Sequence, residues 1–281
     1  MARLIQFCTS ASLYDGPFDS VHGWSAAGMG YLIVTDGGRL IMIDGGFEED
    51  AETLLSLMKS ATGQETPTVD LWIVTHPHGD HYYALRRLAG EDMRCKLSVK
   101  RLAYRFPADF TDRGGNTCLG DAREMRRVAD VFGAEAVTPE VDEHISIDGL
   151  DLHFLYVPYD VSGLNNFNQL SLIFRITGSE QSVMITGDAF HKSLNEVTVR
   201  YGSSLRSDIL QMPHHGLCDT GHLEFYGYVG AETLLIPTSI AGDRAMHSDL
   251  YGIDSRRANL FAEEQADKVY KAFEGTVEIK I

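Results

Sequence analysis

The stretch Thr75-His76-Pro77-His78-Gly79-Asp80-His81 decides how this chain is interpreted. It places three of the 11 histidines and one aspartate within six positions. The run directly follows the apolar residues 71–74, which predict a buried strand that breaks into a loop. Imidazole nitrogens and carboxylate oxygens together suit zinc, and also iron or manganese. The run therefore predicts a metal-binding loop at the end of a strand.

The spacing within this loop suggests ligands for two ions. His76 and His78 are two residues apart, so in extended chain their rings project to the same side. Gly79 permits a tight turn, and we expect Asp80 to cap a helix that opens at His81 while its other oxygen points inward. The alternative, ordinary loop histidines beside a helix cap, does not account for three imidazoles and a carboxylate packed together.

Two later segments repeat the pattern of a strand that ends in a tight turn with possible ligands. Residues 182–186 lead into Gly187-Asp188, and residues 208–212 lead into Pro213-His214-His215-Gly216. Each has an ordinary explanation, a helix cap for Asp188 and a hydrogen-bonded core feature for the histidine pair. Because one loop cannot complete two coordination spheres, we expect these turns to supply the remaining ligands.

Composition favours a soluble globular protein and argues against some partners. The 281 residues are 44% hydrophobic and 23% charged, with a formal net charge of −16 that opposes binding to nucleic acid or anionic membrane. No segment reaches the apolar length of a membrane span, and the first eight residues are too short for a signal peptide. The cysteines form no CxxC pair and predict free thiols in a reduced, cytoplasmic protein: Cys8, Cys95, Cys118 and Cys218.

Strands and helices alternate along the chain. Strands are expected at 31–34, 39–43, 71–74, 97–104, 150–157, 170–176, 182–186, 208–212, 234–236 and 276–279. Helices are expected at 48–59, 81–89, 118–132, 189–200 and 255–273. Asp36-Gly37 predicts a hairpin, and we interpret residues 106–117 as a plain loop rather than a mobile flap. No linker divides the chain, so we expect one mixed α/β domain over residues 1–281.

These motifs resemble those of the metallo-β-lactamase superfamily. Residues 76–81 match its HxHxDH signature, and Ile43-Asp44-Gly45-Gly46, Thr186-Gly187-Asp188 and Pro213-His214-His215-Gly216 follow the order and spacing of that family. The resemblance extends from about residue 31 to 247. It implies an αββα sandwich of two mixed β-sheets flanked by helices, with two divalent metal ions at one edge, zinc in the first place and manganese or iron as alternatives.

The resemblance also implies how the ligands are shared, with Asp188 bridging the two ions. The first ion would have His76, His78 and Asp188, and the second would have Asp80, His81, Asp188 and one of His214 and His215. Which histidine of the pair coordinates stays open. In this family the other member can lie against the substrate.

The chain departs from the family where many members place a third histidine for the first ion. The histidines in that interval are His144 and His153, and His153 lies in the middle of an expected strand. Residues 165–172 occupy the place instead, with an N-x-x-S pattern that resembles a branch containing the hydrolase domain of bacterial DNA-uptake channel proteins and the phosphorylcholine esterases. Asn168 either hydrogen-bonds a water that fills the gap or only shapes a turn.

Three further residues are candidates for supporting roles. Asp44, at the end of the preceding strand, is expected to hydrogen-bond a ligating histidine rather than coordinate metal itself. His191 follows Asp188 by one helical turn and could approach the pocket. His247 matches a late histidine of the same branch, and it is either an acid near the site or an exposed loop residue.

The residues and the resemblance together predict a metal-dependent hydrolase. A hydroxide shared by two ions would attack phosphorus or a carbonyl carbon, because metal binding lowers the pKa of water to about 7. Asp80 would coordinate or orient it, and His214 or His247 would protonate the leaving oxygen. The branch and the charge favour a small phosphate ester, first a phosphodiester, over DNA. The alternatives are an acyl hydrolase for a lactone, thioester or β-lactam, and a metal-binding module without turnover.

Overall fold

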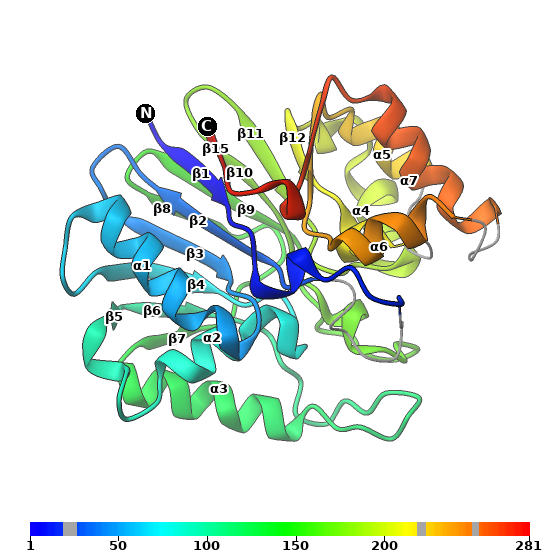
Figure 1. The fold of residues 1–281 in the computed structure, drawn as a ribbon. Helices are drawn as coiled ribbons and strands as arrows, with labels where there is room; N and C mark the ends of the chain where they lie inside the picture. The colour runs from blue at the N-terminus through cyan, green and yellow to red at the C-terminus, as the bar shows by residue number, and fades with distance from the viewer. Residues whose placement is uncertain (19–26, 218–222, 249–252) are drawn as a thin grey trace.

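The chain folds into two mixed β-sheets packed face to face, with helices on both outer sides (Figure 1). This computed structural model describes residues 1–18, 27–217, 223–248 and 253–281, and for residues 253–256 only the backbone. The arrangement confirms the predicted αββα sandwich. None of the helices in the described ranges is long and apolar enough to cross a membrane.

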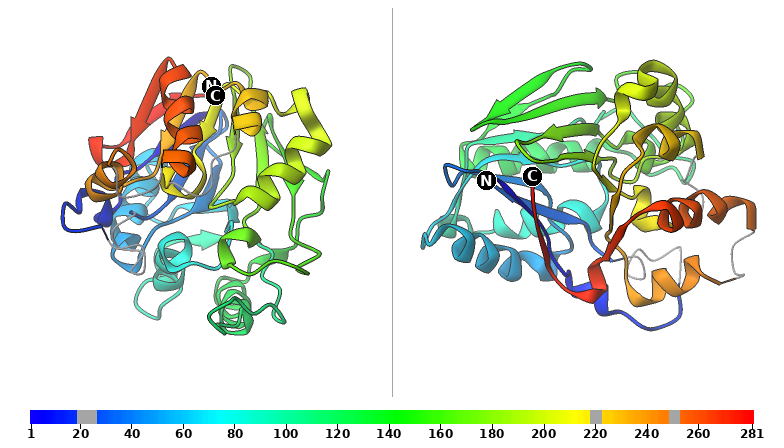
Figure 2. Two further views of the ribbon diagram at one scale, coloured as in Figure 1. Left: turned by 90° about the vertical axis from the view of Figure 1, so that its right-hand side faces the viewer. Right: turned by 90° about the horizontal axis from the view of Figure 1, so that it is seen from above.

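The first sheet carries the early motifs. Its strands follow the order β15 (Val277–Lys280), β1 (Arg3–Gln6), β2 (Gly30–Val34), β3 (Leu40–Asp44), β4 (Thr68–Ile73), β6 (Arg101–Ala103) and β7 (Glu135–Val137), with β5 (Ser98–Val99) beside β4. Its outer face packs against α1 (Ala51–Thr62), α2 (Gly79–Leu88) and α3 (Leu119–Phe132). The termini lie side by side because β15 pairs with β1 (Figures 1 and 2).

The second sheet carries the later motifs. Its order is β14 (Lys268–Lys271), β13 (Thr233–Ile236), β12 (Ile209–Gln211), β11 (Ser182–Ile185), β10 (Ile173–Thr177), β9 (Leu150–Tyr156) and β8 (His144–Ile147). The helices α4 (His191–Tyr201), α5 (Leu223–Val229) and α7 (Ile253–Gln265) cover its outer face, and α6 (Ile240–Met246) lies near them (Figure 1).

Side-chain alternation along β3 shows how the core is divided. Ile41 and Ile43 face the second sheet and join the cluster between the two sheets, whereas Leu40 and Met42 face α1 and α2. Because both faces of the strand are covered, its residues form a continuous apolar run. The apolar run stops at Asp44, the last residue of β3, which is itself buried.

Most of the predicted elements are confirmed, and β2 and β3 form the antiparallel hairpin that Asp36-Gly37 indicated. The expected helix 255–273 is wrong in its second half, because α7 ends at Gln265 and Lys268–Lys271 forms the edge strand β14 instead. This segment pairs in parallel with β13, and ladder hydrogen bonds to that strand override the helical pattern. The strands β1, β7 and β8 had no sequence prediction.

Smaller differences concern element ends. The expected strand 97–104 is divided into β5 and β6. The expected strand 170–176 begins only at Ile173, and its first residue, Leu170, belongs to a 3₁₀ turn over Phe167–Leu170. Residues 106–117 form a loop in which Thr111 pairs with Thr117. Cys8, Cys95 and Cys118 are free thiols, while Cys218 lies outside the described residues.

Candidate metal centre

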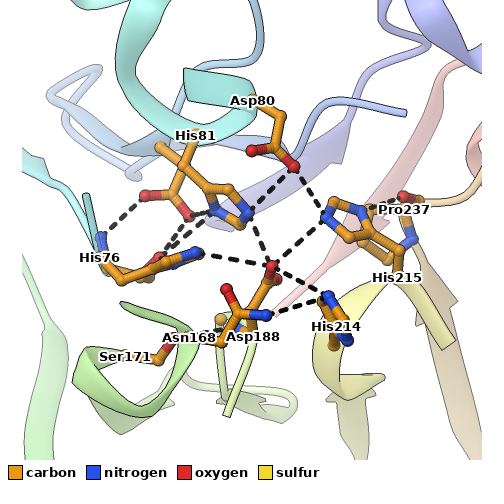
Figure 3. Close-up of polar contacts among 12 residues, drawn as sticks. His76, Asp80, His81, Asn168, Ser171, Asp188, His214, His215 and Pro237 are labelled. Carbon is orange, nitrogen blue, oxygen red and sulfur yellow. Dashed lines mark hydrogen bonds and ion pairs between the residues drawn. The ribbon is translucent and has the colours of Figure 1, made fainter. Parts of the chain in front are cut away.

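The three predicted loops converge at one edge of the sandwich, as Figure 3 shows. The first loop follows β4, the second follows β11, and the third follows β12. Because β11 and β12 are parallel neighbours, their carboxyl ends bring Asp188 and the His214-His215 pair to the same place. The site thus joins residues from both sheets.

Two groups of side chains at this edge have the geometry to hold metal ions. Within each group, one ligand atom per residue lies within 4.8 Å of the others, and Asp188 belongs to both. The groups are His76, His78 and Asp188, and Asp80, His81, Asp188 and His215. The structure therefore brings together the HxHxDH residues, Asp188 and one member of the histidine pair, and that member is His215.

Distances across the two groups centre on the Asp188 carboxylate. Its Oδ1 lies 3.2 Å from Nε2 of His81, and its Oδ2 lies 3.5 Å from Nε2 of His76 and 3.6 Å from Nε2 of His215. The Asp80 Oδ2 atom lies 3.1 Å from Nε2 of His215. One carboxylate is thus placed between imidazoles of both groups.

Buried polar atoms in these groups lack hydrogen-bond partners within the described residues. They are Nε2 of His76, Nε2 of His81, Nε2 of His215 and Oδ1 of Asp188. A buried polar atom without a partner costs about 1–3 kcal/mol, so several in one place need an explanation. Imidazole nitrogens and carboxylate oxygens are both common ligands of zinc and similar ions. The residues present therefore fit divalent cations.

Hydrogen bonds on the outer side of the rings leave their inner nitrogens available. Nδ1 of His215 lies 2.7 Å from the carbonyl oxygen of Pro237, which only accepts, so Nδ1 carries the proton. Nδ1 of His81 lies 2.8 Å from Oδ2 of Asp44. In each ring Nε2 is then the nitrogen that points into the site, as the coordinating atom of a metal ligand must.

Asp44 is fully buried and holds the first loop in two ways. Besides contacting His81, its carboxylate accepts hydrogen bonds of 2.8 Å from both the backbone N–H and the hydroxyl of Thr75. It adopts a left-handed backbone with φ of 54°, which aspartate tolerates better than most residues. The structure therefore places Asp44 behind a ring of the second group, and not in either group itself.

Asp80 does not cap the helix. The helix α2 begins at Gly79, one residue before Asp80 and two before the expected start at His81. His78 is the residue that precedes its first turn. The predicted cap is therefore wrong: Asp80 lies inside that first turn, and its carboxylate points toward His81 and His215. The presence of an acidic group in the first helical turn still agrees with the helix dipole.

The electrostatics of the two groups differ. Burial lowers the pKa of His76 well below its ordinary value and also lowers that of His78. Burial acts in the same sense on His215, but the carboxylates of Asp188 and Asp80 outweigh it and raise the pKa of His215 to about 10. The pKa of Asp188 stays well below its usual range, because the facing imidazoles outweigh the effect of burial. The site therefore holds ionised carboxylates ready for a cation.

The family comparison agrees with this geometry. The model of the metallo-beta-lactamase superfamily matches residues 27–158, which include the HxHxDH run. The match supports membership of the metallo-β-lactamase superfamily. Proteins of this superfamily are generally metal-dependent hydrolases. No curated protein sequence matches the chain at a significant level.

Solved structures show the same fold at low sequence identity. The metallo-beta-lactamase fold protein YhfI from Bacillus subtilis is 16% identical, with a TM-score of 0.55 over 99% of this chain and 100% of that chain. Zn²⁺-bound PqqB from Methylobacterium extorquens is 12% identical, with a TM-score of 0.57 over 100% of both chains. A diphosphatase from the PhnP family is 15% identical, with a TM-score of 0.50 over 100% of this chain and 98% of that chain. At these identities the likeness shows the fold alone.

The place of the third histidine is taken by the turn that contains Asn168. Its Nδ2 lies 3.0 Å from Nε2 of His214, and its backbone N–H donates to the side chain of Asn166. The two other candidates, His144 and His153, stack on each other on β8 and β9 with ring centroids 4.2 Å apart. Neither belongs to the two groups, and Asn168 lies beside Asp188 and His214 at the site (Figure 3).

His214, His191 and His247 lie outside the two groups. His214 is 19% exposed and its Nε2 lies 3.9 Å from Asp188, beside the centre (Figure 3). His191 is an exposed residue at the start of α4. His247 follows α6, where its ring contacts the carbonyl oxygen of Asp243 and lies 3.7 Å from Oε2 of Glu263.

Two supporting residues were not assigned a role from the sequence. Thr75 binds Asp44, and Ser171 accepts a hydrogen bond of 3.0 Å from the backbone N–H of Asp188 (Figure 3). Thr75 belongs to the run 75–81 and Ser171 to the N-x-x-S pattern, so their positions in these motifs were the only sequence signal for a role at the site. The hydrogen bonds cross between distant loops, and a single sequence does not show such pairings.

Proposed function

We propose that this protein is a metal-dependent hydrolase of phosphoesters, acting first on phosphodiesters, with two divalent ions at the edge of the sandwich. The observation that carries the proposal is the pair of ligand groups that share Asp188 and direct unpartnered buried atoms inward. Zinc suits this donor set best, and manganese or iron are alternatives.

The proposed ligand sets follow the two groups. His76, His78 and Asp188 would hold the first ion, and Asp80, His81, Asp188 and His215 would hold the second. Ions held there would lower the pKa of bound water and neutralise the charge that develops on the substrate oxygens. Three protein ligands for the first ion leave more open coordination positions, which would allow a substrate oxygen to approach.

The surrounding residues would orient the reactants and move protons. Asp44 fixes the ring of His81, and Asp188 holds the two groups at a set separation. We assign the contact with substrate to His214, because it is partly exposed beside Asp188 and is held by Asn168. In this arrangement Nε2 accepts from the Asn168 amide, so His214 would have to release that contact before a protonated Nε2 could donate to the leaving oxygen. His247 contacts Asp243 and Glu263, so it is a weaker candidate for this role.

A small phosphate ester is favoured over a long nucleic acid. The net charge of −16 repels polyanions. The arginines of α2 are already paired, Arg86 with Glu48 at 3.0 Å and Arg87 with Asp92 at 2.7 Å. A diphosphatase of the PhnP family has a similar fold, so this fold is compatible with phosphate chemistry.

We further propose that residues 1–281 act as one hydrolase domain in a reducing, cytoplasmic setting. The ligands come from both sheets, so neither half contains a complete site. The three described cysteines are free thiols, which agrees with a reducing compartment.

The test combines metal analysis with two substrate classes. Elemental analysis of the purified protein is expected to give two divalent ions per chain, and the loaded protein should hydrolyse bis(p-nitrophenyl) phosphate but not nitrocefin or lactones. Turnover of nitrocefin or lactones alone would replace the proposal with an acyl hydrolase. Tight metal occupancy without turnover of either class would indicate a metal-binding module instead.

A further inference from the structure

The turn that carries His215 has an unusual backbone. His214, His215 and Gly216 have φ values of 49°, 58° and 76°, so three consecutive residues are left-handed. A non-glycine residue in this region is strained and persists only where the surroundings hold it. The conformation of this turn sets the position of a proposed ligand. The contacts that hold the turn therefore bear on the centre.

One buried amide binds the end of the turn. Asn259, on α7, is fully buried, and its Nδ2 donates to the carbonyl oxygens of Gly216 at 2.8 Å and Leu217 at 2.9 Å. Its Oδ1 accepts a hydrogen bond of 2.6 Å from the hydroxyl of Tyr226, on α5. Both hydrogens of the amide and its oxygen are thus used. The helices α5 and α7 supply no proposed ligand, but this single side chain connects both of them to the turn by hydrogen bonds.

His215 is therefore fixed at two points. Its Nδ1 is held by the carbonyl oxygen of Pro237, and the chain immediately after it is held by Asn259. If the second hold is lost, the turn can relax toward ordinary backbone angles while Nδ1 stays in place. The ring would then tilt and move Nε2 away from Asp80 and Asp188. His76 and His78 have no hydrogen bond to this turn in the described contacts.

We propose that Asn259 is a positioning residue for the second metal site, and that Tyr226 orients its amide. The inference rests on the proposed function, since it assumes that the Asp80, His81, Asp188 and His215 group binds an ion. It predicts an asymmetric effect: loss of the Asn259 amide weakens the second ion and leaves the first ion nearly unchanged.

The chain offers a matched control in Gln6. This amide is also buried, accepts a hydrogen bond of 3.1 Å from the hydroxyl of Tyr31, and donates to the carbonyl oxygen of Tyr270 at 3.2 Å. It thus links a tyrosine and a backbone carbonyl as Asn259 does, but on β2 and β14 rather than at the ligand turn. Gln6→Leu removes a comparable set of buried hydrogen bonds away from His215.

The experiment is a calorimetric zinc titration of the metal-free protein and three full-length variants, with thermal unfolding of each. Wild type is expected to bind two ions. Asn259→Leu should weaken the second ion by about 10–100-fold, the usual effect of removing a group that supports a ligand. Tyr226→Phe should weaken it by less than about tenfold, as expected for the loss of one hydrogen bond. Gln6→Leu should lower the melting temperature but keep both affinities.

Several outcomes would overturn the inference. If Asn259→Leu binds both ions as tightly as Gln6→Leu, Asn259 only stabilises the fold. An equal loss at both sites would contradict the predicted asymmetry. Should Asn259→Leu fail to fold, Tyr226→Phe decides, and unchanged affinity for the second ion in that variant rejects the proposal. Failure of the wild-type protein to bind zinc would instead reject the proposed function.

Discussion

Asp188 is the residue on which the proposed centre depends most. Its carboxylate lies between imidazoles from the first and third loops. Burial raises the pKa of Asp188, but these imidazoles outweigh burial and keep the carboxylate ionised. The sequence marked it only as an acidic residue after a glycine at a strand end. That signal is weak by itself, and it gained weight because two other loops showed the same pattern.

Substitution Asp188→Ala is expected to remove both ions and all hydrolytic activity, because one carboxylate serves both groups. Elemental analysis and a diester assay of the purified variant would measure this. Asp151→Ala is the control, since that carboxylate pairs with His144 on the strand surface at 2.9 Å. Full metal content with retained activity in Asp188→Ala would reject the two-ion arrangement.

Protons should compete with metal at His215. Its pKa is raised to about 10 without metal, so at neutral pH it carries a proton that a coordinating nitrogen must lose. Burial lowers the pKa of His81 in the same group, but the carboxylates of Asp188, Asp80 and Asp44 outweigh it and raise that pKa well above its ordinary value. Binding of the second ion should therefore release at least one proton, and its affinity should rise as pH increases. Titration calorimetry in buffers of different ionisation enthalpy counts these protons. Zero proton release at pH 7.5 would contradict the prediction.

At the scale of elements, the sequence predicted most clearly the segments with a strong local pattern. The hairpin of β2 and β3 and the amphipathic helix α3 have such patterns, and both are confirmed. The prediction of one helix over 255–273 was wrong, because it missed the end of α7 and the strand β14. The boundary between these two elements depends on the pairing of β14 with β13, which lies more than 30 residues earlier. The predicted start of α2, at His81, was two residues too late, since Gly79 and Asp80 both fit the first turn.

The start of α3 gives a prediction about thiol reactivity. Cys118, just before the helix, is buried, and burial and the nearby Asp121 raise its pKa to about 12. Little thiolate forms at pH 8, so Cys118 should resist N-ethylmaleimide in the native protein while the exposed Cys95 reacts. Peptide mapping by mass spectrometry distinguishes the two. Both should react in denaturant, and equal native rates would contradict the described burial.

For the whole molecule, the two sheets share one apolar interior. Residues of both, such as Ile43 and Phe174, belong to the same buried cluster. The order of strands across the sheets was not predictable from one sequence, because it depends on contacts between distant segments. The resemblance to a known family supplied the architecture that local patterns could not.

This shared interior predicts a single unfolding transition. Backbone circular dichroism and tryptophan fluorescence, to which buried Trp72 contributes, should change at the same temperature, because neither sheet can lose its inner face alone. Zinc at 100 times its dissociation constant should add about 2.7 kcal/mol for each ion bound, and a chelator should remove that gain. Two separate transitions would indicate halves that fold independently, and no effect of zinc on the transition would argue against binding to the folded state.

The left-handed backbone at Asp44, His214 and His215 has a consequence for protein design. The geometry of the centre depends on the backbone conformation of these residues as well as on the identity of their side chains. Transplanting only the coordinating residues onto regular strands of another scaffold should give a weak metal binder, because their nitrogen and oxygen atoms would point in other directions. A successful graft would need to carry the bends themselves, together with the groups that keep them bent.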